Sequence, residues 1–511
     1  MGNSLHQSTD VQEVEKLCHK GKEYFANKQY KQARRSYRQA LAKLQSTTIS
    51  KTDDDINQAL ATIYLYLTDV YIKECKYDKA NQACHNSFNL AQKRNDLPFV
   101  AMILDRQGDI KRLQSDYKLA MQNLNHALDI KLRINQGEEN LNVAQSYTMI
   151  GCLYYQQSAY QNGVDMYQKA LGIKLNILGQ NHNEIIELYN QLGNGNYQQC
   201  QYEDALNAYL KALNIRINMD GEKHCDVANC YMKIGLIYDK QSNYDRAIDM
   251  YENALTIRLQ MLGKNHLDVA KLYHQIGIAY RYQGHYEIAL SMHQKAVDIR
   301  LKLQQDYHPD LAQLYQDMAD IHSLQFAYKA ALSLFALALK IHLKLYGEND
   351  IKVSCLYCSI GDIYRHQCSF DKAYAKYQHA LKIVLKVKGN NRDYVAQLYN
   401  NLGLTLRYQS LLDEALNMSN KALDIYLDLY QENHSIVALV YQNISNIYQK
   451  QGKSEKAAMM KQKSFHITQI LQQDSLTSGD QIANQQSSGK TSVFVLSLPI
   501  FDIYFHVTLG K

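Results

Sequence analysis

Residues 233–255 read KIGLIYDKQSNYDRAIDMYENAL, and the order of small and large residues in this stretch decides the fold. Gly235, Ala247 and Ala254 are small, and Tyr238 and Tyr251 stand between them. Small residues let two helices approach closely, while large residues at helical spacing fill the space between them. The stretch therefore predicts two helices that are joined by a short turn and pack against each other.

The same pattern recurs every 42 residues along most of the chain. The position of Gly235 is called the anchor of its repeat, and the eight anchors in phase with it are Gly151, Gly193, Gly235, Gly277, Ala319, Gly361, Gly403 and Ser445. Weaker copies precede them, with anchors at Gly21, Thr68 and Gly108. We predict an all-α solenoid of about eleven helix-turn-helix repeats over residues 11–471.

Changes in composition along the chain define the expected segments. We expect an N-terminal segment at 1–10, degenerate repeats at 11–135, regular 42-residue repeats at 136–471, a disordered linker at 472–490 and an apolar tail at 491–511. The apolar run VFVLSLPIFDIYFHV at 493–507 is short for a membrane span. It could dock on the last repeat, join the sheet of a partner, or be an error of the gene model, and the sequence does not choose among these.

Charge and cysteine usage limit the class of protein. The 511 residues carry a net charge of only +6, which is no footprint of nucleic-acid binding, so we expect no nucleic-acid partner. Ten cysteines at irregular spacing and the lack of a secretory leader indicate a reducing compartment. The sequence therefore predicts a cytoplasmic protein with no membrane span.

Histidines recur at one place in the repeat and raise the question of a ligand set. They stand in turn-like stretches such as LGKNHLDVA at 262–270, and they are His182, His224, His266, His308 and, after two vacant cycles, His434. A glycine precedes most of these turns and suits a helix C-cap, and residues such as histidine, asparagine and aspartate lead into the next helix. Neighbouring turns lie a whole repeat apart, so we interpret these histidines as punctuation between helices and not as a shared metal site.

Small and large residues in this order are the signature of the tetratricopeptide repeat, which the stretch 233–255 resembles closely. The 42-residue period and the turns around the histidines resemble the kinesin light chain and nephrocystin-3 type of array. This resemblance covers most of the chain and implies an α-helical solenoid that binds proteins, with an association with the cytoskeleton. Kinesin light chains pair with the heavy chain through N-terminal heptads, and only about ten residues precede the repeats here, so we do not expect kinesin heavy chain as a partner.

In this repeat family the first helix of each pair lines a concave groove, with the positions two and three residues before the anchor facing into it. The residues expected to line the groove are Thr148, Asn190, Gln191, Lys233, His274, Gln275, Gln316, Asp317, Asn400, Asn401, Gln442 and Asn443. Amides dominate this set, and an amide offers both a donor and an acceptor to the backbone of an extended peptide. We predict a groove for peptide segments, with a merely solvated helix face as the alternative.

A second series of positions carries cations on the second helix of the repeats. Its members are Lys131, Lys174, Arg216, Arg258, Arg300 and His342. Cations near a helix C-terminus complement the helix dipole, which is the structural interpretation. The alternative is an acidic peptide partner, as the resemblance to kinesin light chains implies.

Motifs that could carry chemistry are few and weak. Cys355 and Cys358 form a C-x-x-C with His366 and Cys368 nearby, but they replace ordinary repeat positions and are interpreted as structural. GNGNYQ at 193–198 lacks the third glycine of a dinucleotide loop and falls in a predicted helix, where Gly195 is expected to soften that helix. SGKT at 488–491 lacks the first glycine of a P-loop. We predict no catalytic, metal or cofactor site.

The sequence thus favours a non-enzymatic scaffold that binds proteins or peptide segments, acidic ones included, in a concave groove. Two alternatives remain open. One is a kinesin light chain-like cargo adaptor, and the other is a regulatory fragment of a larger enzyme.

Overall fold

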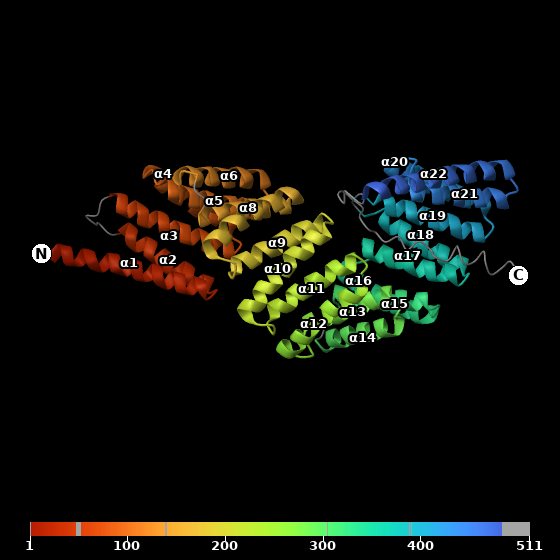
Figure 1. The fold of residues 1–511 in the computed structure, drawn as a ribbon, viewed down its shortest axis with the longest axis horizontal. Coiled ribbons are helices and arrows are strands. Elements are labelled where there is room, and N and C mark those ends of the chain that lie inside the picture. Colours follow the sequence, from red (N-terminus) through yellow and green to blue (C-terminus); the bar gives the residue numbers. More distant parts are fainter. Residues whose placement is uncertain are drawn as a thin grey trace. The chain divides into compact units, whose positions relative to one another are not determined.

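The chain folds into helices only, over the part that can be described. The computed structural model describes residues 2–46, 53–137, 140–303, 305–387, 389 and 391–482, and within these ranges it contains 22 α-helices and no strand. Consecutive helices form eleven pairs (Figure 1). The predicted all-α architecture of about eleven helix-turn-helix repeats is confirmed.

The chain divides into two compact units, residues 1–222 and residues 223–511. Five helix pairs belong to the first unit: α1 (Gly2–Ala26) with α2 (Tyr30–Ser46), α3 (Asp53–Lys73) with α4 (Tyr77–Lys93), α5 (Leu97–Leu113) with α6 (Tyr117–Ile134), α7 (Leu141–Gln156) with α8 (Tyr160–Leu178), and α9 (Asn183–Gln198) with α10 (Tyr202–Asp220). The sequence boundary at residue 135 separates weak from regular copies of the repeat inside this unit.

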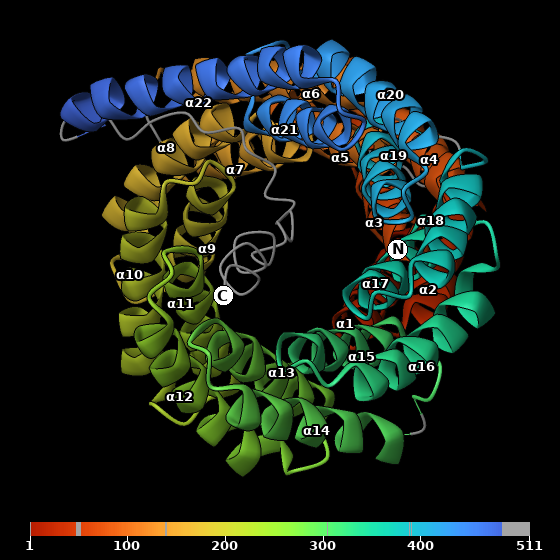
Figure 2. The same ribbon diagram turned by 90° about the vertical axis from the view of Figure 1, so that its right-hand side faces the viewer.

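Six helix pairs belong to the second unit: α11 (Cys225–Lys240) with α12 (Tyr244–Leu262), α13 (Leu267–Tyr282) with α14 (Tyr286–Lys302), α15 (Pro309–Leu324) with α16 (Tyr328–Tyr346), α17 (Ile351–His366) with α18 (Phe370–Val384), α19 (Arg392–Tyr408) with α20 (Leu412–Tyr430), and α21 (Ser435–Lys450) with α22 (Ser454–Ile482). Within this unit the odd-numbered helices from α11 to α19 lie on the inner side of the curve and their even-numbered partners lie on the outer side (Figure 2). The first helix of each of these pairs therefore belongs to the inner layer.

At most glycine anchors the residue is small because a ring of the partner helix lies directly against it. In the pair α11–α12, a Cβ added to Gly235 would come within 2.6 Å of the Tyr251 ring, closer than real Cβ contacts. Ala247 and Ala254 of α12 are fully buried, as close helix packing requires. The packing that was predicted from residues 233–255 is confirmed at each of these positions.

The repeating histidines are N-caps of the inner helices. The His266 Nδ1 accepts a hydrogen bond of 3.1 Å from the backbone N–H of Asp268, at the start of α13. The same contact occurs at His182, His224, His308 and His434, and Asp350 makes it with a carboxylate. A side-chain acceptor at this place satisfies a backbone donor that has no partner inside the helix. The interpretation of these residues as punctuation is confirmed.

Turns inside the pairs differ from those between pairs. Between pairs, Gly179, Gly221, Gly263 and Gly347 end the outer helices with φ of 75–80°, as the sequence predicted. Inside the pairs, the left-handed position is occupied mostly by residues other than glycine, Phe326 with φ 59° among them. This left-handed position could not be recognised from the sequence, because among the described residues glycine occupies it only at Gly284 and Gly452.

The first and the last helix extend beyond the repeat boundaries that the sequence predicts. The helix α1 begins at Gly2 and so includes residues of the predicted N-terminal segment 1–10. The helix α22 ends at Ile482, inside the segment 472–490 that the sequence predicts as a linker. Residues 483–511, which include SGKT at 488–491 and the apolar run 493–507, lie outside the described residues.

Candidate functional site

The twelve predicted groove residues lie on first helices of the pairs, and they fall into two groups. Nine are partly exposed: Thr148, Asn190, Gln191, Lys233, His274, Gln275, Gln316, Asn401 and Gln442. The other three are buried: Asp317, Asn400 and Asn443. The two groups therefore have different surroundings, although they occupy equivalent places in the repeat.

The buried group links neighbouring inner helices to each other. The Nδ2 of Asn443 on α21 donates a hydrogen bond of 3.1 Å to the Oδ1 of Asn400 on α19. The Nδ2 of Asn401 lies 3.7 Å from the Sγ of Cys358, one repeat earlier. Each link joins a residue three before one anchor to a residue two before the next anchor. These side chains satisfy one another, so for Asn400 and Asn443 the expectation of a free groove side chain needs revision.

A third link of the same kind carries charge. The Nε2 of His274 on α13 lies 2.5 Å from the Oδ2 of Asp317 on α15, and the Gln313 amide donates to the other carboxylate oxygen at 3.0 Å. Burial by itself raises the pKa of Asp317, but the hydrogen bond and the charge of His274 outweigh it and hold this pKa below its ordinary value. Asp317 is therefore held by its own chain.

Next to this link lies a buried imidazole without hydrogen bonds. His293 of α14 is fully buried against Gly277, its ring centroid lies 5.4 Å from that of His274, and neither ring nitrogen has a partner among the described residues. Burial lowers the pKa of His293 to about 4, although the charge of Asp317 acts in the opposite direction. The ring is thus neutral at physiological pH.

Two amides of the partly exposed group make no hydrogen bond within the described part of the chain. Gln275 on α13 and Gln316 on α15 make no hydrogen bond with any described residue. By contrast, Gln191 donates to Glu187 at 2.6 Å and Gln442 donates to Asn446 at 3.2 Å on their own helices. In adjacent repeats of the second unit, Gln275 and Gln316 therefore keep their hydrogen-bonding capacity for a ligand.

The cation series, in contrast, is used inside the protein. Arg258 on α12 pairs with Asp268 in the first turn of α13 at 2.8 Å, and Lys174 pairs with Glu184 of the next repeat at 2.7 Å. Arg300 makes the same pair with Asp310. The cations of these pairs are buried. They connect their own helix to the following one, and of the three only Arg300 lies in the last turn of its helix, where a cation complements the helix dipole.

The remaining members of the cation series make different contacts. Lys131 contacts Asp105 at 2.5 Å and Ser146 at 2.7 Å, on the helices that precede and follow it. Arg216 contacts Asp220 of its own helix and Asn183 at 2.9 Å each. Only His342 lacks a hydrogen-bond partner among the described residues. The series therefore gives no support to an acidic partner, because its charges are neutralised by carboxylates of this chain.

A regular aromatic row was missed at the sequence level. Every regular repeat has a tyrosine four residues before its anchor: Tyr147, Tyr189, Tyr231, Tyr273, Tyr315, Tyr357, Tyr399 and Tyr441. In six of these repeats a lysine ammonium of the second helix lies 5.1–5.6 Å from the ring centroid, as Lys295 does above Tyr273. The strict 42-residue spacing of these tyrosines was the signal that could have revealed the row. Such contacts stabilise the pair of helices.

Cys358 of the C-x-x-C motif and Gly195 of GNGNYQ are both buried among the helices. Cys358 is buried, and burial raises the pKa of its thiol well above the ordinary value. GNGNYQ lies inside α9, as predicted, and a Cβ on Gly195 would come within 2.7 Å of Val164, so this glycine has a packing role. Among the described residues, no group of three or more His, Cys, Asp or Glu side chains is arranged to hold a metal ion.

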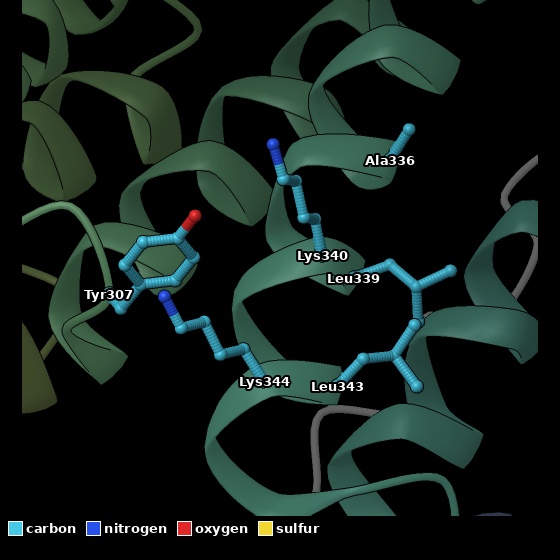
Figure 3. Close-up of a pocket in the computed structure, with 6 residues that line it drawn as sticks. All are labelled: Tyr307, Ala336, Leu339, Lys340, Leu343 and Lys344. Atoms are coloured by element: carbon cyan, nitrogen blue, oxygen red, sulfur yellow. The ribbon is translucent and has the colours of Figure 1, made fainter.

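A shallow pocket on the outer layer offers binding groups without catalytic ones. It lies on α16 and the segment before α15 (Figure 3), and its lining consists of Tyr307, Ala336, Leu339, Lys340, Leu343 and Lys344. Lys344 reaches over the Tyr307 ring, with its ammonium 3.3 Å from the ring centroid. This lining contains no carboxylate, thiol or imidazole, so it lacks a nucleophile and base pair.

Comparison with known proteins identifies the family. The tetratricopeptide repeat model matches residues 142–218, 184–260, 226–302, 268–344 and 352–428. These stretches cover more than half of the 511 residues, and the chain belongs to the tetratricopeptide repeat family. Repeats of this family are generally scaffolds for protein interaction, and their solenoid is typically non-enzymatic. None of the curated proteins matches the chain.

Three solved structures are similar to parts of this chain. The apo form of RapI is 16% identical with a TM-score of 0.48, over 78% of this chain and 99% of RapI. BtubC (BKLC) from P. vanneervenii is 21% identical with a TM-score of 0.40, over 46% of this chain and 93% of that chain. A protein from Podospora anserina, named as a candidate kinesin light chain with nearly identical TPR-like repeats, is 17% identical with a TM-score of 0.37, over 41% and 99% of the two chains.

Among the helices of the described residues, none is both long and apolar enough to cross a bilayer.

Proposed function

We propose that this chain is a scaffold that binds extended peptide segments of partner proteins along its inner helices, with the amides of Gln275 and Gln316 as backbone contacts. The observation that carries the proposal is the pair of partly exposed amides in adjacent repeats that make no hydrogen bond with described residues. An extended peptide has an N–H and a C=O at each residue, and a glutamine amide can serve both.

Other inner-layer side chains support the same mode of binding. Asn401 and Gln442 are partly exposed on α19 and α21. Their amides are already engaged with Cys358 and Asn446, so a ligand would have to share them. In the first unit, Thr148 and Asn190 donate to backbone carbonyls of their own helices at 2.9 and 3.0 Å. We therefore assign the principal contacts to α13 and α15.

Partners are proposed to be proteins or peptides recognised through their backbone, with no requirement for acidic side chains. The cation series is paired within the chain, so charge does not select the ligand at that place. Binding that depends on backbone hydrogen bonds is weakly affected by salt, whereas binding through exposed charges is screened. Measured affinities at low and high salt separate these two modes.

A double variant of the free amides tests the proposal. Proteins captured from native lysate by the wild-type chain are identified by mass spectrometry, and their affinities are then measured for Gln275→Ala/Gln316→Ala. The loss of two hydrogen bonds is expected to weaken binding by about tenfold. The matched control is Gln168→Ala/Gln260→Ala, which removes two exposed amides from α8 and α12, each the second helix of its pair. Equal affinity of wild type and inner-layer variant, or an equal loss in the control, would contradict the proposal.

A second candidate function is that of a kinesin light chain-like cargo adaptor. The observation that favours it is the 42-residue period of the repeats, which the sequence shares with that type of array. Co-purification of kinesin heavy chain with the wild-type chain tests it. Heavy chain that is recovered at a stoichiometric level supports the adaptor, and recovery of other partners without it supports an independent scaffold.

A further inference from the structure

The last helix of the described array leaves one face without a partner. On α22, Ala458, Lys461, Phe465 and Thr468 are spaced by three or four residues, so they share a face, and all four are exposed. We call them the terminal face. Phe465 is 62% exposed, the largest exposure among the large hydrophobic residues of the described chain.

Equivalent residues in the earlier regular repeats are buried or half-buried. Phe465 stands twenty residues after its anchor. The equivalent residues Leu171, Leu213, Val297 and Leu423 are at most 9% exposed, and Leu255, Leu339 and Leu381 are half-buried. Leu171 packs in one cluster with Ile185 and Leu188 of the next inner helix, α9. The exposure of Phe465 therefore results from its place at the end of the array, where no described helix follows α22.

An apolar segment lies further along the same chain. The stretch VFVLSLPIFDIYFHV at 493–507 is predominantly apolar and contains one carboxylate, Asp502. The terminal face combines an apolar ring with the ammonium of Lys461, which makes no ion pair with any described residue. Apolar contact with Phe465 and charge pairing between Asp502 and Lys461 are thus complementary.

The chain is long enough for the segment to return to this face. From Phe465 to Ile482 the helix rises by about 26 Å, at about 1.5 Å per residue. The ten residues 483–492 can span about 33 Å when extended, which is sufficient to run back along α22. A segment tethered so closely has a high effective concentration, so even a small apolar contact can hold it.

We propose that residues 493–507 dock on the terminal face of α22 in the same chain, with the side chain of Phe465 at the centre of the contact. This covers the apolar ring that the array leaves exposed and takes the place of a following repeat. The proposal is independent of peptide binding by the inner helices.

A single tryptophan reports on this contact, because the chain contains none of its own. Phe465→Trp places an indole on the terminal face, and its emission maximum and its quenching by acrylamide are measured in the full chain. The tail is then altered in the same background by Phe501→Ser/Ile503→Ser. Leu385→Trp serves as the control reporter, because Leu385 is 61% exposed and lies in another repeat.

Docking predicts a blue-shifted and severalfold less quenchable indole at position 465, at all protein concentrations, and loss of both effects with the altered tail. The reporter at position 385 is expected to be unaffected by the tail. Identical emission and quenching with either tail would overturn the proposal. Protection that grows with protein concentration would also overturn it and would assign the face to a second copy.

Discussion

Two neighbouring repeats place different rings at one position, and we expect them to differ in their response to pH. In α11–α12 the ring is that of Tyr251, and in α13–α14 it is the imidazole of His293, each buried against the glycine anchor of its pair. The backbone packing is the same, and only the imidazole can gain a charge in the range of mild acid. The fold therefore accepts either ring. The imidazole of His293 carries a cost, because its buried nitrogens make no hydrogen bond with a described residue.

The largest expected effect is the loss of the tyrosine ring. Tyr251→Ala should lower the free energy of unfolding by about 3–5 kcal/mol, because it removes a large buried side chain and leaves a cavity. His293→Ala should cost less, since the imidazole is smaller and its desolvated nitrogens are removed at the same time. Urea unfolding at pH 7 measures both. Equal losses would show that the unpaired nitrogens carry no penalty.

The second largest effect is expected in acid, which should lower the stability of the repeat with His293 more than that of the repeat with Tyr251. The pKa of His293 is lowered by burial from 6.5 to about 4 in the folded chain, so the unfolded state binds more protons between these values. Its neighbours act both ways: Asp317 raises this pKa, and His274 and Arg281 lower it. Stability is therefore lost as the pH falls from about 6.5 to about 4, by on the order of 3 kcal/mol.

The control for the acid effect replaces the imidazole with a ring found at the same position in the next repeat. His293→Phe copies Phe335, which is buried against Ala319. This variant should be more stable at neutral pH and should lose less stability between pH 6.5 and 4. Hydrogen exchange of the amides in α13 and α14 follows the effect locally. An unchanged pH dependence would remove His293 as its source.

The ion pair that follows the pair α11–α12 and the one that follows α13–α14 should contribute about equally to stability. Arg258 and Arg300 pair with Asp268 and Asp310 across the same kind of boundary. Arg258→Met and Arg300→Met should each cost about 1–2 kcal/mol, because the carboxylate that remains is partly exposed and keeps part of its hydration. Thermal unfolding of the two variants measures this. A large difference between them would mean that the ring exchange also alters the boundary.

The smallest effect is expected at the N-caps. His266→Ala and His308→Ala should each cost about 0.5–1 kcal/mol through loss of the acceptor for the backbone N–H two residues on. His266→Asp should retain stability, because Asp350 serves as the natural cap of α17. Denaturation midpoints at pH 7 compare the three variants. A loss in the aspartate variant equal to that in the alanine variant would contradict the capping role.

Local packing was predictable from the sequence because it follows from the size of a few residues. Gly235 against Tyr251 fixes one helix pair, and the period of 42 residues extends the result along the array. The histidine caps were predictable for a different reason, since the start of a helix needs a side-chain acceptor at a definite place.

The candidate site was predictable only in part, because its residues depend on contacts between repeats. Asn400 and Asn443 match the groove pattern as well as Gln275 does, yet they bond to each other across 43 residues. No spacing rule distinguishes a linked amide from a free one, since both are polar residues on the same helix face. The ion pairs of Arg258 and Arg300 were missed for the same reason.

Photo-crosslinking tests whether partner peptides bind along the inner helices. A photoreactive phenylalanine analogue is placed at position 275 on α13 and, in a separate chain, at position 260 on α12, and both are irradiated with the partners captured by the wild-type chain. Binding along the inner helices predicts crosslinks from position 275 and none from position 260. Crosslinks from position 260 alone, or equal yields from both positions, would contradict it.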